Sequence, residues 1–168
     1  LYQQQPSPED GDLFQRENIQ YYEKKDLPKN LKIYAASDHA VGIDKSRHDL
    51  TCLLIVGVDE EDDIYLLDCW WARQPTDMVV KAMLGFMKKW NPLIWWAEKG
   101  HITKSIAPFL RKRMFETATH CRIEEVTPVA NKVQRSQSMI GRMAMKKVFF
   151  PKTSAWGGKA VDELLKFP

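Results

Sequence analysis

The sequence predicts an α/β fold in which helices cover both faces of a mixed β-sheet. Three apolar runs come first, at residues 31–38, 50–58 and 64–71, and helical patterns then alternate with further apolar runs. Hydrophobic residues make up 44% of the 168 residues, which is enough to fill one buried core. An antiparallel three-strand part that leads into alternating helices and parallel strands gives a mixed sheet with helices on its faces.

Residues 1–30 are predicted to be a linker or extended arm, and residues 31–168 the folded domain. The first 30 residues are polar and carry four turn-forming residues, with room for a helical turn or two near 14–22; the turn formers are Pro6, Pro8, Gly11 and Pro28. The chain starts without Met, without a basic region and without an apolar core. This start excludes a signal peptide and indicates a cut from a longer chain. No run of about 18 apolar residues occurs, so no membrane span is expected.

The first strand, at residues 31–38, is a short apolar run that ends in the carboxylate of Asp38. The runs at 50–58 and 64–71 are rich in β-branched and aliphatic residues, and a turn of acidic residues at 59–63 joins them. Such a short connection predicts an antiparallel hairpin with a solvated tip.

The region from residue 75 to residue 98 is predicted to be a helix followed by a buried strand. Thr76 is a suitable N-cap, apolar side chains recur at helical spacing up to Trp90, and Pro92 stops the helix. Residues 93–97 are continuously apolar before Glu98, as expected for a central strand that is covered on both faces.

The remaining elements are predicted with weaker signals. A second helix runs to about Glu116, with Pro108 in its first turn, and residues 121–126 form a weak strand. Asn131 is expected to cap a third helix. Residues 148–151 form a short extended piece, and residues 160–165 start or form a last helix.

The formal net charge of +3 conceals an asymmetry along the chain. Residues 1–98 hold 11 Lys and Arg against 17 Asp and Glu, whereas residues 99–152 hold 12 Lys and Arg against three Glu. An acidic first part followed by a strongly basic segment is typical of a protein that holds a polyanion beside a group of carboxylates. A solvated basic surface is the alternative interpretation.

Asp38 and Glu98 both stand where an apolar strand meets a polar loop. If these two strands are neighbours, the carboxylates lie side by side, and two such groups favour a cation between them. Mg²⁺ and Mn²⁺ accept oxygen ligands, and two of these ions can promote phosphodiester hydrolysis. A strand-end acid can also be merely solvated or bonded to loop amides. Asp44 and Asp49 are further candidates whose roles stay open.

Other chemistries find little support in the sequence. Three cysteines without CxxC spacing indicate reduced thiols rather than a zinc site; they are Cys52, Cys69 and Cys121. The chain has no GxxxxGK[ST] loop, so it does not encode an ATPase, and no GxSxG elbow for serine catalysis.

Several short motifs in a fixed order carry a family resemblance. They are QQPSPEDGDLF at 4–14, YAASDHA at 34–40 followed by DLT at 49–51, WWAE at 95–98, NKVQRS at 131–136 and ELLKFP at 163–168. Together they resemble the C-terminal nuclease domain of the large terminase subunit of tailed bacteriophages. The resemblance implies a ribonuclease-H-like fold and a two-metal DNA endonuclease, using Mg²⁺ or Mn²⁺, that trims concatemeric double-stranded DNA during packaging.

The resemblance also implies site residues and partners. Asp38 and Glu98 would be catalytic, metal-binding acids, and Lys132 and Arg135 would contact DNA. The basic stretch of the second helix, at Arg111, Lys112 and Arg113, is a further DNA-binding candidate from its charge. The implied partners are the terminase ATPase domain of the same parent chain, the portal ring and the small terminase subunit, in the cytoplasm of the host cell.

One family feature is absent: the third acidic motif follows a Phe-Pro, and this sequence stops at Pro168. The sequence therefore predicts a nuclease domain truncated before that motif, with weak metal binding and weak cutting. Two alternatives stay open. One is a catalytically silent module that binds DNA or docks on the portal. The other is a different ribonuclease-H-like nuclease, such as a junction resolvase or a ribonuclease for RNA–DNA hybrids.

Overall fold

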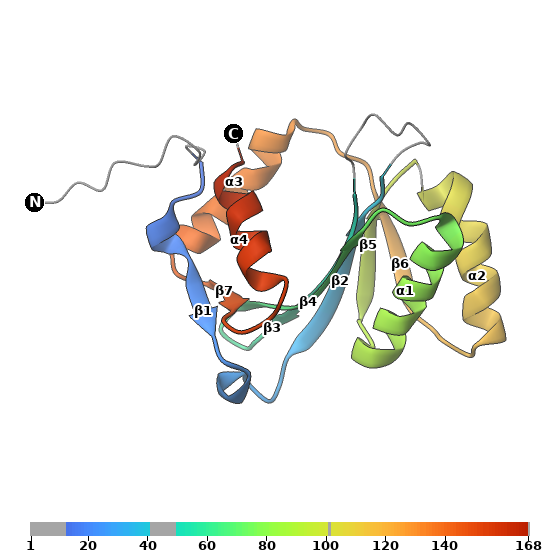
Figure 1. The fold of residues 1–168 in the computed structure, drawn as a ribbon, viewed down its shortest axis with the longest axis horizontal. Coiled ribbons are helices and arrows are strands. Elements are labelled where there is room, and N and C mark those ends of the chain that lie inside the picture. The colour runs from blue at the N-terminus through green and yellow to red at the C-terminus, as the bar shows by residue number, and fades with distance from the viewer. Residues whose placement is uncertain (1–12, 41–49, 101, 168) are drawn as a thin grey trace, which may run out of the picture.

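A seven-stranded mixed sheet forms the centre of the molecule in the computed structural model, which describes residues 13–40, 50–100 and 102–167 (Figure 1). From one edge to the other the strands are β1 (Gln20–Tyr22), β7 (Val148–Pro151), β4 (Ile64–Ala72), β3 (Thr51–Val58), β2 (Lys32–Asp38), β5 (Ile94–Glu98) and β6 (Arg122–Val126). Strands β2, β3 and β4 pair antiparallel, as the short acidic turn predicts. The other pairings are parallel.

The helices divide between the two faces of this sheet (Figure 1). Helices α1 (Thr76–Trp90) and α2 (Ala107–Glu116), the latter preceded by a π-helical segment (Ile102–Ile106), lie on one face. Helices α3 (Lys132–Ala144) and α4 (Gly157–Leu165) lie on the other. The predicted fold class is therefore confirmed. No helix of the described residues combines the length and the apolar character needed to span a membrane.

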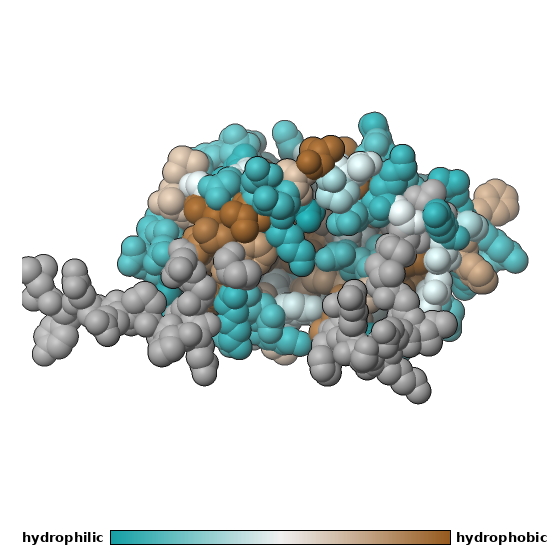
Figure 2. All heavy atoms as spheres, turned by 90° about the horizontal axis from the view of Figure 1, so that it is seen from above, coloured by the Kyte–Doolittle hydropathy of each residue, from teal (hydrophilic) through white to brown (hydrophobic). Residues whose placement is uncertain are grey.

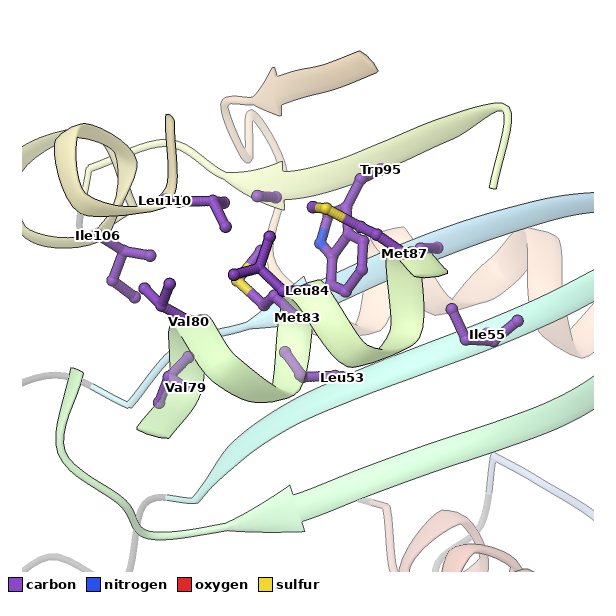
Figure 3. Close-up of a cluster of buried hydrophobic side chains, with 12 residues drawn as sticks. Leu53, Ile55, Val79, Val80, Met83, Leu84, Met87, Trp95, Ile106 and Leu110 are labelled. Atoms are coloured by element: carbon purple, nitrogen blue, oxygen red, sulfur yellow. The ribbon is translucent and has the colours of Figure 1, made fainter. Parts of the chain in front are cut away.

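The larger core lies between α1, α2 and the strands β2, β3 and β5 (Figure 3). Its centre is Trp95 of β5, whose ring is wholly buried beside Met83 and Met87 of α1. The alternation of buried and partly exposed residues along β3 directs Leu53 and Ile55 into this core. Burial of such apolar side chains is the main favourable contribution to folding.

A second core joins α3 and α4 to β4 and β7, and the chain before β2 belongs to it. Phe14 and Ile19 are buried there, and Tyr22 of β1 donates a hydrogen bond to the Leu66 carbonyl at 2.6 Å. Residues 13–30 therefore differ from the linker or arm that the sequence predicts. Apolar residues are too sparse in this segment to predict a strand from sequence. Strand β1 forms by pairing with the edge of β7. Residues 1–12 of that segment lie outside the described residues.

The face that carries α3 and α4 is covered unevenly. Both helices pack over β3, β4 and β7, and they leave the β2–β5–β6 end of that face open. Trp96 of β5 is 38% exposed there and stacks on Tyr34 of β2, with ring centroids 5.3 Å apart. The expectation that residues 93–98 are covered on both faces is therefore wrong: Trp95 and Ala97 are buried, but Trp96 and Glu98 face outward.

Candidate active site at the ends of β2 and β5

Asp38 and Glu98 end two neighbouring strands that run in the same direction. Strand β2 pairs parallel with β5, and the last paired residues are Ser37 and Ala97. The next residue on each strand is the acid, so the two carboxylates stand at the same edge of the sheet, about one strand spacing apart. Both residues are exposed. The strands that end in Asp38 and Glu98 are thus neighbours, as the hypothesis of a shared cation site requires.

The two acids border a pocket of about 570 Å³ on the open face of the sheet. Strands β2, β3 and β5 form part of it through residues such as Ala36, Cys52 and Trp96, and residues 126–129, at and after the end of β6, also line it. Most of the lining is apolar. Among the described residues, the carboxylates are therefore accessible from the end of this face that α3 and α4 leave open. Figure 2 shows the molecule from above, with hydrophilic residues predominating and hydrophobic residues gathered in separate areas.

Arg135 is the basic side chain that α3 brings to this pocket. Its Nη1 lies 3.8 Å from Oε2 of Glu98, and both side chains are about half exposed, so the ion pair is weak. The start of α3 is fixed by a capping box: the Asn131 side chain accepts from the Gln134 amide at 2.8 Å, and the Gln134 side chain accepts from the Asn131 amide. The predicted cap at Asn131 is confirmed. It fixes the first turn of α3 and therefore the position of Arg135 on that helix.

A hydrogen-bond chain beneath the acids ties their strands together. The buried Trp95 of β5 donates its Nε1–H to Oγ of Ser37 at 2.9 Å, and Ser37 Oγ also bonds Nε2 of the buried His39 at 2.8 Å. Ser37 and His39 flank Asp38, so the chain fixes the backbone that carries this carboxylate. Sequence reasoning missed this arrangement. The only available signal was the pair of polar residues on either side of Asp38 at the end of an apolar run.

The other predicted site residues are not brought to the pocket. Lys132 is exposed in the first turn of α3 but is not among the lining residues. Arg111, Lys112 and Arg113 lie on α2, which packs on the opposite face of the sheet. Two of these three pair with Glu116 on the same helix, Arg113 at 2.6 Å and Lys112 at 3.9 Å. Asp44 and Asp49 lie outside the described residues.

The donor set at the pocket suits a hard cation that retains water. Among the described residues, no three His, Cys, Asp or Glu side chains gather closely enough to hold a metal ion. Mg²⁺ is commonly bound through one or two carboxylates with waters and phosphate oxygens as the other ligands. Asp38 and Glu98 fit that mode. The described residues do not supply enough ligands for a metal site built wholly from protein side chains.

Solved structures of one nuclease share the fold of this chain. The large terminase nuclease from thermophilic phage G20c is similar over 88% of this chain and 67% of its own, with a TM-score of 0.57 and 11% identity. Its form with bound magnesium gives a TM-score of 0.56 and 9% identity over the same shares. Its form with bound zinc gives a TM-score of 0.53 and 11% identity, over 89% of this chain and 75% of its own. The sequence matches no protein-family model and no curated protein. The chain therefore shares its overall fold, a mixed sheet with helices on both faces, with the G20c large terminase nuclease.

Proposed function

We propose that this chain is the metal-dependent endonuclease domain of a viral genome-packaging terminase, which cuts concatemeric double-stranded DNA. The observation that carries the proposal is the placement of Asp38 and Glu98 on neighbouring parallel strands at an open pocket. The fold shared with the G20c terminase nuclease, which has been solved with bound magnesium, supports it.

In this proposal Asp38 and Glu98 supply carboxylate oxygens to Mg²⁺ or Mn²⁺ in a two-metal site. Bound ions would supply Lewis-acid chemistry there: activation of a water and stabilisation of the leaving oxygen of the phosphodiester. The family resemblance implies a third acid for such a site, in a motif that follows a Phe-Pro. The Trp95–Ser37–His39 hydrogen bonds hold the strand that presents Asp38, and Arg135 lies 3.8 Å from Glu98 at the pocket.

DNA would lie along the open face, where Arg135 neutralises phosphate beside the acids and Lys132 extends the contact along α3. The terminase ATPase domain of the same parent chain, the portal ring and the small terminase subunit are the proposed partners, in the host cytoplasm. Residues 13–30 would be part of this domain, because Phe14 and Ile19 belong to its core.

The test is digestion of supercoiled plasmid in Mg²⁺ or Mn²⁺ by the 168-residue chain and by a chain extended past Pro168 through the third acidic motif. We expect the extended chain to cut faster. In it, Asp38→Asn and Glu98→Gln should each reduce the rate by more than the roughly 10–100-fold that loss of an outer-shell partner costs. The control is Glu60→Gln, which removes an exposed acid from the distant β3–β4 turn.

Three results would contradict the proposal. Cutting by Asp38→Asn at the rate of Glu60→Gln would remove Asp38 from the reaction. A strong preference of the extended chain for four-way junctions or RNA–DNA hybrids over linear duplex would assign it to another nuclease class. Duplex binding without cutting by the extended chain in either metal would leave the silent module as the better description.

A further inference from the structure

Two thiols face each other across β3 and β4 next to the candidate active site. The Sγ atoms of Cys52 and Cys69 lie 3.8 Å apart, and both cysteines are free. In the antiparallel register Cys52 pairs with Trp71 and Cys69 pairs with Leu54, so the two cysteines are diagonal neighbours on the same face of the sheet. Their separation of 17 residues in sequence gives no CxxC spacing, and only the strand register reveals the pair.

Small reagents can reach this pair through the pocket. Cys52 lines the pocket, and both thiols are partly exposed. The hydrogen bond with Cys52, together with burial, raises the pKa of Cys69. Because Cys52 lines the pocket and Cys69 does not, Cys52 is the thiol that a reagent in the pocket meets first, and Cys69 is placed to resolve what Cys52 forms.

We propose that Cys52 and Cys69 form a reversible dithiol–disulfide site that small disulfides oxidise. In the first step the Cys52 thiolate attacks a sulfur of oxidised glutathione and releases one glutathione thiolate. In the second step Cys69, after losing its proton to solvent, attacks Sγ of Cys52 and releases the second glutathione. The protein gives up two electrons and two protons, and one oxidised glutathione becomes two reduced molecules.

The geometry fits this chemistry better than it fits two independent thiols. A disulfide needs an S–S distance of about 2.05 Å, so the two Sγ atoms must approach by about 1.8 Å. Cys121 provides the contrast. Its Sγ contacts the Pro92 carbonyl at 3.6 Å, and its side chain packs against the larger core, on the opposite face of the sheet.

The test uses the intact chain, reduced and then exposed to buffered mixtures of oxidised and reduced glutathione. After acid quenching and alkylation under denaturing conditions, we expect the chain to take up one alkyl group instead of three. The oxidised chain should be lighter by two hydrogen atoms, and digestion should yield a peptide pair joined through Cys52 and Cys69. Dithiothreitol should restore three alkylations.

The matched variants separate this site from general thiol oxidation. Cys121→Ser should keep the loss of two hydrogens, whereas Cys52→Ser and Cys69→Ser should abolish it and accumulate the glutathione adduct of the remaining thiol. A wild-type chain that ends only as glutathione adducts, or whose joined peptides involve Cys121, would overturn the proposal. The readout is mass alone, so it does not depend on whether the chain cuts DNA.

Discussion

Ser37 is the residue on which the local geometry of Asp38 depends. Its Oγ accepts the indole N–H of Trp95, whose side chain is wholly buried, and it also bonds His39. A buried donor that loses its acceptor incurs its full desolvation cost, which is larger than the net value of an average hydrogen bond. The small hydroxyl of Ser37 therefore contributes to stability well beyond its size.

We predict that Ser37→Ala lowers the free energy of unfolding by about 1–3 kcal/mol, the cost of one unsatisfied buried donor. Urea denaturation followed by tryptophan fluorescence measures it. Ser138→Ala on the exposed surface of α3 is the control and should change the free energy by less than about 0.5 kcal/mol. Equal effects of the two substitutions would show that the Trp95 indole finds another acceptor.

At the scale of elements, the strands that position the acids could be predicted from sequence, because each is a continuous apolar run that ends in a charge. The same holds for α1 and for the Asn131 cap of α3, which depend on local spacing and side-chain chemistry. Strand β1 could not be predicted. It consists of three residues whose pairing depends on β7, more than 120 positions later in the chain.

Tyr22 offers a test of whether β1 is an integral strand. Burial, reinforced by the charge of Asp68, raises the pKa of Tyr22 to about 12 from 10.0. Because the folded pKa is the higher one, the stabilisation by neutral Tyr22 is complete below pH 10 and is lost as the pH rises towards 12. Other groups titrate in this range, so the informative quantity is the difference between variant and wild type.

We predict that Tyr22→Phe lowers the free energy of unfolding by about 0.5–1.5 kcal/mol near neutral pH, through loss of the hydrogen bond to Leu66. The difference from wild type should shrink between pH 10 and 12, measured by urea titration at each pH. Tyr21→Phe, at a side chain that is 53% exposed, should follow the wild type throughout. A constant Tyr22→Phe difference across this range would refute the linkage to Tyr22 ionisation.

On the scale of the whole molecule, the basic residues of segment 99–152 lie on both sides of the sheet, some on α2 and others on α3. Charge counting along residues 99–152 cannot say which side chains share a face. The structure places Arg135 beside Glu98 on the open face, and it places Arg111, Lys112 and Arg113 on α2, behind the sheet. The acids were predictable as strand ends. Which basic side chains lie beside them depends on where α2 and α3 pack on the sheet, and local sequence does not encode that packing.

This separation leads to a prediction about duplex binding. Each phosphate contact contributes about 0.9 to the slope of log affinity against log salt concentration for duplex DNA. If DNA lies along the open face, Arg135→Gln and Lys132→Gln should each reduce that slope by about one. The combined Arg111→Gln, Lys112→Gln and Arg113→Gln variant should leave it unchanged. Fluorescence anisotropy with a labelled duplex, without divalent cations so that no cutting occurs, measures all three. A slope that falls with the α2 variant and not with Arg135→Gln would place the duplex behind the sheet, away from Asp38 and Glu98, and would separate DNA binding from the candidate active site.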